Sequence, residues 1–133
     1  MSSTATDQDF FVYLEEVDAK ENSTLLSEGA IRASNRATRD PPFDNQSLPW
    51  HAGFEEDQLR LDPGVPVKLE LALYPTSSYI KKGNRLRVTL NNSDAGQWDT
   101  PVIAPAPVVR IFRDRTHPSS IKLPFVPIST RLN

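Results

Sequence analysis

The sequence of 133 residues contains no cysteine and no long apolar run. The absence of cysteine excludes disulfides, zinc–thiolate sites and a thiol nucleophile together, and it suits a reducing compartment. No apolar stretch approaches the roughly 20 residues that span a bilayer. The amino terminus, MSSTATDQDF, lacks the basic and apolar regions of a signal peptide. We therefore expect a cytoplasmic protein that does not associate with membranes.

The chain also lacks an excess of positive charge. It has 15 lysines and arginines against 17 acidic residues, a formal net charge of −2. That balance creates no field that would concentrate phosphates, which argues against nucleic acid as a partner. The length and an apolar fraction of 38% suit one domain with a modest core. We expect residues 1–133 to form a single domain.

Helices are disfavoured along the whole chain. Twelve prolines against five glycines leave few stretches in which a helix would contain no interior proline, so strands must carry the fold. Apolar periodicity predicts strands at residues 10–17, 23–27, 65–73, 86–90, 108–113 and 120–125. Short strands separated by turn residues are typical of an all-β sandwich or jelly roll.

The stretch LYPTSSYIKKGNRLRVTL, residues 73–90, joins the two most regular of these strands. Pro75 would end the strand at 65–73, and Gly83 would allow the turn into the strand at 86–90. We predict that the two strands form a hairpin-like pair in the core. Gly29 is expected to end the short strand at 23–27.

Residues 39–62 predict a long loop that is rich in proline, acidic and amide residues. Phe43, Trp50 and Phe54 lie within it. Aromatic residues in a disordered linker would gain no burial to offset the entropy of ordering. We therefore expect an ordered loop that packs over an open end of the core or serves a function.

Serine-hydrolase chemistry finds little support in the sequence. No Gly-x-Ser-x-Gly nucleophile elbow is present. His117 lies near Asp114, Ser119 and Ser120, so a triad can be drawn, but neighbours in sequence rarely have the required geometry. We interpret His117 as a histidine in a polar turn and predict no catalytic residue on this chain.

Metal and cofactor sites are not indicated either. The histidines and acidic residues show no ligand spacing, and no Gly-rich loop could cradle a phosphate. Glu55, Glu56 and Asp57 could bind calcium in a loop, but the Asp-x-Asp-x-Asp-Gly pattern is absent. We interpret these three residues as a solvated face and expect no metal and no cofactor.

Trp50 beside His51, and Trp98 beside Asp99, lie in predicted loops. Tryptophans in such loops either stack on sugars at the end of a sandwich or anchor the loop to the core. These four residues are our candidate ligand-binding or cleft-facing residues. They leave a carbohydrate-binding, lectin-like module as an alternative function.

The stretch SLPWHAGFEEDQLRLDPGVPVKLELALYPTSSYIKKGNRLRVTLNNSDAGQWDTP resembles the carboxy-terminal domain of the CocE/NonD hydrolases. That family includes cocaine esterase, α-amino acid ester hydrolases and X-Pro dipeptidyl-peptidases. DQDFFVYLEEVDAKENSTLLSEGAIRAS and HPSSIKLPFVP resemble other strands of the same domain, so the similarity runs from about Asp7 to Pro127. Where the family has Gly-His-Arg, this chain has Gly83-Asn84-Arg85.

The resemblance implies a jelly-roll β-sandwich, similar to galactose-binding domains, that packs on an α/β-hydrolase domain and walls its active-site cleft. In that family the catalytic triad lies on the hydrolase domain, so no catalytic residue carries over, and hydrolase activity is implied only for a full-length parent. Loops such as 44–57 and 93–100 would lie beside the cleft.

The resemblance also implies a missing part. Family members have strands of this domain before the segment that matches residues 10–17, so we expect a sandwich lacking its first strands. Exposed sheet edges invite pairing with another strand. We therefore expect a homo-oligomer formed through those edges.

Overall fold

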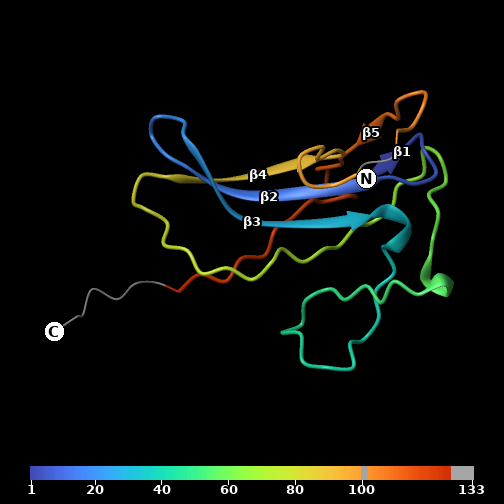
Figure 1. Cartoon of the computed structure of the whole chain (residues 1–133), viewed down its shortest axis with the longest axis horizontal. Helices are drawn as coiled ribbons and strands as arrows, with labels where there is room; N and C mark the ends of the chain where they lie inside the picture. The colour runs from blue at the N-terminus through green and yellow to red at the C-terminus, as the bar shows by residue number, and fades with distance from the viewer. Residues whose placement is uncertain (100–101, 127–133) are drawn as a thin grey trace.

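The computed structural model describes residues 1–99 and 102–126, and these residues form a nearly all-β chain with two antiparallel sheets (Figure 1). The larger sheet has the strand order β3-β2-β4. Its strands are β2 (Asp9–Val17), β3 (Ser23–Arg32) and β4 (Arg85–Asn91). The all-β prediction is confirmed, and the architecture is consistent with a β-sandwich. A jelly-roll connectivity, and a single domain over the whole chain, stay predictions.

The smaller sheet and two short turns complete the secondary structure of the described residues. β1 (Ser2–Ser3) pairs with β5 (Val109–Arg110). Single 3-10 turns occur at η1 (Ala33–Asn35) and η2 (Glu55–Asp57). Within residues 1–99 and 102–126, no helix is long and apolar enough to cross a bilayer.

Strand β2 is the centre of the larger sheet and is covered on both faces, as its sequence predicts. Phe10 and Phe11 point to opposite faces, yet their exposed fractions are only 1% and 4%. We call the face of Phe10 the inner face and that of Phe11 the outer face. Ile31, Ala33 and Leu61 join Phe10 in the core cluster of the inner face.

The turn between β2 and β3 is built on Asp18. Its Oδ1 accepts hydrogen bonds from the backbone N–H groups of Lys20 and Asn22, at 2.8 and 2.9 Å. Such side-chain-to-backbone bonds replace turn bonds that the backbone would otherwise make. The predicted strands at residues 10–17 and 23–27 are therefore confirmed as a hairpin.

Strand β3 is longer than predicted because Gly29 does not end it. Gly29 is buried in the middle of the strand, opposite Val12. A Cβ placed there would overlap the carbonyl oxygen of Ala72 and lie 2.9 Å from Cδ1 of Leu71. The glycine therefore marks a point where another stretch of backbone approaches the strand closely. After Gly29 the strand runs on to Arg32, and a 3-10 turn follows.

The predicted strand at residues 65–73 is wrong as a strand, although part of its apolar side is half-buried. Val67, Leu69 and Leu71 pack against the core cluster. The segment belongs to neither sheet, and its ends are held by separate bonds instead. The N–H of Val67 donates to the Met1 carbonyl at 2.7 Å, and that of Tyr74 donates to the Glu28 carbonyl at 2.8 Å.

The hairpin-like pair predicted for residues 65–90 is consequently wrong as well. The strand expected at 86–90 exists as β4, but β4 pairs with β2 and not with residues 65–73. Apolar alternation identifies which side of a segment is buried, but it carries no information about the partner strand. Here the partner lies far back in the sequence.

The two predicted carboxy-terminal strands are also corrected. Of residues 108–113, only Val109–Arg110 form a strand, and residues 120–125 form none. Pro118 precedes the second segment and Pro124 lies within it, and proline has no N–H to give to a ladder. Pro127, at the end of the family-like stretch, lies outside the described residues.

One side-chain cluster on the outer face joins all three strands of the larger sheet. The Glu15 carboxylate in β2 accepts hydrogen bonds from Arg87 and Thr89 of β4 and from Ser23 of β3, at 2.5 to 2.9 Å. The Glu15 side chain is only 16% exposed. These hydrogen bonds, the Arg87 bonds foremost, lower the pKa of Glu15 from its usual 4.5 to about 2.

Replacing Gly29 by alanine is expected to destabilise the fold, because the added methyl group has no room beside Ala72. Overpacking of this kind costs about 1–3 kcal/mol. The matched control is Gly96→Ala, whose Cβ would lie 3.6 Å from the nearest atom and should change little. Urea unfolding followed by far-ultraviolet circular dichroism compares the two. Equal stability of both variants would contradict the close approach.

The Glu15 cluster predicts a pH dependence of stability. Because folding lowers the pKa of Glu15, its contribution is complete above pH 4.5 and is lost as the pH falls toward 2. Glu15→Gln should therefore destabilise the protein at pH 7, by about 1–3 kcal/mol, with the difference from the original protein shrinking below pH 4.5. Urea unfolding at several pH values measures this, with exposed Glu55→Gln as control. A difference that stays constant with pH would refute the prediction.

Candidate functional site

The four candidate residues lie at two separate hollows. Trp98 lines one on the outer face of the larger sheet, which we call the outer-face hollow. Trp50 lines a second within the loop of residues 38–50, which we call the loop hollow. No residue lines both hollows, and His51 and Asp99 line neither. The structure therefore does not bring the two tryptophans together on one platform.

Strand register explains the floor of the outer-face hollow. Phe11 lies opposite Ala30, and Tyr13 lies opposite Glu28, so these four side chains share the outer face. They line the hollow, whose volume is only about 10 Å³, together with Gly29, Tyr74 and Trp98.

Trp98 forms one wall of this hollow. Its ring centroid lies 6.2 Å from that of Phe11, with the planes tilted by 39°. The ring remains 49% exposed. Trp98 is thus both an anchor against β2 and a ring presented to solvent, which combines the two alternatives for this residue.

The loop that carries Trp98 is fixed by Asp94. The Tyr13 hydroxyl donates to Oδ2 of Asp94 at 2.7 Å, and the N–H of Trp98 donates to the Asp94 carbonyl at 2.8 Å. Burial, the bond to Asp94 and the charges of Asp94 and Glu28 raise the pKa of Tyr13 to about 12. Tyr13 therefore stays a neutral donor at physiological pH and holds the loop. The loop is described as far as Asp99, which is exposed, and position 100 lies outside the described residues.

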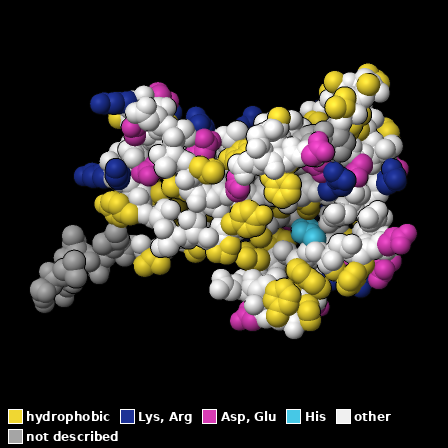
Figure 2. Space-filling model, in the orientation of Figure 1, with side chains coloured by type: hydrophobic (Ala, Val, Ile, Leu, Met, Phe, Trp, Pro, Cys, Tyr) yellow, Lys and Arg dark blue, Asp and Glu magenta, His cyan; other side chains and the backbone are white. Residues whose placement is uncertain are grey.

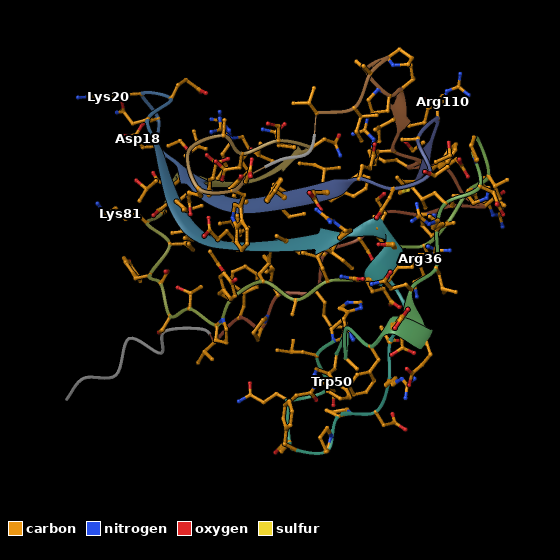
Figure 3. All side chains as sticks on the ribbon, turned by 45° about the vertical axis from the view of Figure 1, so that its right-hand side comes forward. Asp18, Lys20, Arg36, Trp50, Lys81 and Arg110 are labelled. Atoms are coloured by element: carbon orange, nitrogen blue, oxygen red, sulfur yellow. The ribbon has the colours of Figure 1, made fainter. Side chains whose placement is uncertain are left out.

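The loop hollow is wider, about 520 Å³, and open to solvent. Figure 3 places Trp50 in the loop that extends away from the larger sheet. The rings of Trp50 and Phe43 pack edge to face, with centroids 5.9 Å apart. The backbone carbonyl of Trp50 accepts a hydrogen bond from the backbone N–H of Arg39 at 3.1 Å. The loop is therefore held by its own contacts, which agrees with the expectation of an ordered loop. The hollow mixes apolar and charged groups, including Arg39, Asp44 and Glu70.

His51 is a structural link between this loop and the extended segment that follows. Its Nδ1 lies 3.0 Å from the Ala37 carbonyl oxygen and its Nε2 lies 2.9 Å from the Glu70 carbonyl oxygen. Because both ring nitrogens face backbone carbonyls, neither is directed toward a substrate. His51 is therefore a loop anchor in this structure.

The triad drawn through His117 does not have catalytic geometry. Oδ1 of Asp114 lies 3.5 Å from Nδ1 of His117, but among the described residues neither Ser119 nor Ser120 is hydrogen-bonded to the imidazole, and the Ser119 hydroxyl donates to the Phe112 carbonyl at 2.6 Å. Asp114 accepts from the N–H groups of His117 and Thr116, both at 2.8 Å, and these bonds lower the pKa of Asp114. The group is a hydrogen-bonded turn, as we interpreted it.

The acidic residues at 55–57 are held by a cation of the chain itself. Arg39 pairs with Glu56 at 3.1 Å and with Asp57 at 2.7 Å, and its guanidinium lies 5.1 Å from the Phe54 ring centroid. In the part of the chain that the structure describes, no three His, Asp or Glu side chains converge as metal ligands would.

Sequence reasoning missed Tyr13, Glu28 and Tyr74 as neighbours of Trp98. Alternation in β2 was enough to put Tyr13 on the face of Phe11. The end predicted for the next strand at residue 27 hid the placement of Glu28, which a β3 running to Arg32 puts opposite Tyr13. No sequence signal brought Tyr74 to the edge of β3.

Fold and site together define a class: an antiparallel all-β domain that offers aromatic hollows and, in the residues described, no assembled catalytic group. The particular family follows from comparison. The chain belongs to the family of X-Pro dipeptidyl-peptidase C-terminal non-catalytic domains, whose family model matches residues 1–103. The resemblance to the carboxy-terminal domain of the CocE/NonD hydrolases is thereby confirmed.

Two mycobacterial proteins are similar over nearly the whole chain. They are "Putative serine esterase Mb1866c" of Mycobacterium bovis and "Putative serine esterase MT1883" of Mycobacterium tuberculosis. Each is 37% identical over 129 residues, which is 95% of this chain but 20% of the relative. The chain therefore spans about a fifth of the length of these relatives. No solved structure matches significantly.

Tyr13→Phe is expected to release the loop that carries Trp98, because the hydrogen bond to Asp94 is lost. The protein should lose about 1–2 kcal/mol of stability, and the Trp98 emission should shift to the red. Trp50→Phe in all samples isolates the Trp98 signal. Tyr79→Phe is the matched control, since Tyr79 is exposed and its hydroxyl has no partner among the described residues. An unchanged Trp98 spectrum in Tyr13→Phe would show that Asp94 does not hold the loop.

Proposed function

We propose that this chain is a non-catalytic β-module that packs against the catalytic domain of a serine hydrolase and helps wall its substrate cleft. Membership in the X-Pro dipeptidyl-peptidase C-terminal domain family supports this function. So does similarity to a fifth of two proteins named as serine esterases. Hydrolysis would then belong to the whole enzyme, and this module would supply walls that position substrate and exclude water.

The packing surface that we propose is strand β4, because its outer edge is unpaired among the described residues. It is an outer strand of the larger sheet, and its outward backbone groups have no hydrogen-bond partner among residues 1–99 and 102–126. On the inner face, Val88 and Leu90 remain 49% and 41% exposed. An unpaired edge beside uncovered apolar side chains is a surface that proteins normally cover.

Uncovered apolar side chains are not limited to β4. Figure 2 shows hydrophobic side chains at several places on one face of the molecule. Phe43, Leu48 and Trp50 contribute to the loop hollow, where the first two are more than 40% exposed. A catalytic domain seated on β4 would leave the loop hollow free to line a cleft, which is the wall that the family resemblance implies.

Three other expectations stay predictions. A homo-oligomer would use the same β4 edge, with a second copy in place of the catalytic domain. A carbohydrate-binding module would have to use Trp50 and Trp98 separately, because they line different hollows. The cytoplasmic location is likewise untested.

Binding to a hydrolase that lacks its own module tests the proposal. The partner is the Mycobacterium bovis relative from which the segment matching this chain has been removed. We expect a complex in calorimetric titration, and Val88→Glu should weaken it at least about tenfold, because a charge would be buried at the contact. Val65→Glu is the matched control, since Val65 is also 49% exposed but lies outside β4.

Light scattering during size exclusion, at several protein concentrations, shows whether β4 binds a catalytic domain or a second copy of this chain. A dimer that Val88→Glu dissociates, without any complex with the truncated relative, would replace the proposed partner by a second copy. Binding that neither substitution affects would place the contact elsewhere on the module.

A further inference from the structure

The outer-face hollow is lined mainly by aromatic rings and by one carboxylate. Four aromatic side chains line it: Phe11, Tyr13, Tyr74 and Trp98. One carboxylate, that of Glu28, lines it with them. The remaining lining residues are Gly29 and Ala30, which are too small to fill the space. Aromatic rings around a single acid are the ordinary surroundings of a bound cation.

The backbone holds these groups in register. Glu28 lies opposite Tyr13 in the β2–β3 ladder, so both side chains rise from the same face. The N–H of Tyr74 donates to the Glu28 carbonyl at 2.8 Å, and the Tyr74 carbonyl accepts from the Ser27 hydroxyl at 2.5 Å. Tyr74 is therefore fixed at the outer edge of β3, while Trp98 covers Phe11 from the side of β4.

The charge at this hollow is negative and unbalanced. No lysine, arginine or histidine of the described residues lies within 4.0 Å of the Glu28 carboxylate, whereas Glu15, Glu21 and Asp9 all have arginine partners. Tyr13 lies in the same negative field, since the charges of both Asp94 and Glu28 contribute to raising its pKa. Asp94 is occupied by the Tyr13 hydroxyl, which leaves Glu28 as the group available to a ligand.

We propose that the outer-face hollow binds a primary alkylammonium group. The ammonium would pair with the Glu28 carboxylate, and its methylene chain would lie between the rings of Tyr74 and Trp98. The hollow is small, about 10 Å³, which is room for one group of the size of a water molecule. An ammonium head group has that size, and its stem would lie outside the hollow between the rings of Tyr74 and Trp98, which are 59% and 49% exposed. The inference is independent of whether the module packs on a hydrolase.

Titration with n-butylammonium chloride tests the site. In the Trp50→Phe background, Trp98 is the only remaining tryptophan, and its fluorescence should change saturably with a dissociation constant on the order of 1–10 mM. Sodium chloride keeps the ionic strength constant. The control ligand is 1-butanol, which has the same number of heavy atoms without the charge. An equal response to the alcohol, or no saturable response to the amine, would overturn the proposal.

Substitutions assign the binding to Glu28. Glu28→Gln keeps the shape of the side chain and should weaken butylammonium binding about tenfold, because the ion pair is lost at a half-buried position. Glu55→Gln removes an equal charge from an exposed turn and should leave binding unchanged. If Glu28→Gln fails to fold, Tyr74→Leu takes its place, since the exposed Tyr74 ring can be removed with little loss of packing. Unaltered affinity in the folded variant would refute the assignment.

A further arm identifies the source of the ammonium group. The tripeptide acetyl-Gly-Lys-Gly-amide presents a lysine side chain, and its norleucine counterpart presents the same stem without the charge. Binding of the lysine peptide as well as butylammonium, without binding of the norleucine peptide, would assign the hollow to a protein side chain. Binding of butylammonium without the lysine peptide would assign it to a free amine. Equal responses to the charged and the neutral member of both pairs of probes would refute the site.

Discussion

The burial of β2 on both faces is the constraint on which the rest of the structure depends. No disulfide crosslinks the chain, so the two sheet pairings of this one strand hold β3 and β4 together. Its inner face supplies Phe10 to the core, and its outer face supplies Phe11 and Tyr13 to the hollow under Trp98. A strand with two apolar faces needs a cover on each side. The cover on the outer face is the loop of Trp98, and it is the feature that gives this face its chemistry.

Much of the fold could be predicted from sequence because β2 and β4 carry their own signals. FFVYLEEV has alternating apolar residues on both faces, and RLRVTL has a clean alternation, so both strands are where periodicity puts them. The segment at 65–73 has an equally clear alternation and is no strand. Val67, Leu69 and Leu71 face the core, but the backbone joins neighbouring segments at separate points, among them Val67 and Tyr74. Apolar alternation indicates which side of a segment is buried. It does not indicate which other strand will form backbone hydrogen bonds with that segment.

The candidate site was predictable only in part, for a related reason. Trp50 and Trp98 were recognisable as loop aromatics, but whether loops converge is a property of the fold. Glu28 becomes a candidate binding residue only because it lies opposite Tyr13 and because Tyr74 lies beside it at the edge of β3. His51 illustrates the opposite case, because a histidine beside a tryptophan looked like a ligand contact and proves to join two backbone carbonyls.

The pairing of β2 with β4 also has a consequence for how the chain is made. Arg87 and Glu15, which bridge the two strands, are 72 positions apart in the sequence. The β2–β3 hairpin can form as soon as it leaves the ribosome, but its second edge then waits for β4. At a synthesis rate of about 5–20 residues per second, that wait lasts on the order of several seconds. During this interval the most apolar strand of the protein has an open edge, so nascent chains on neighbouring ribosomes are at their most adhesive before β4 emerges.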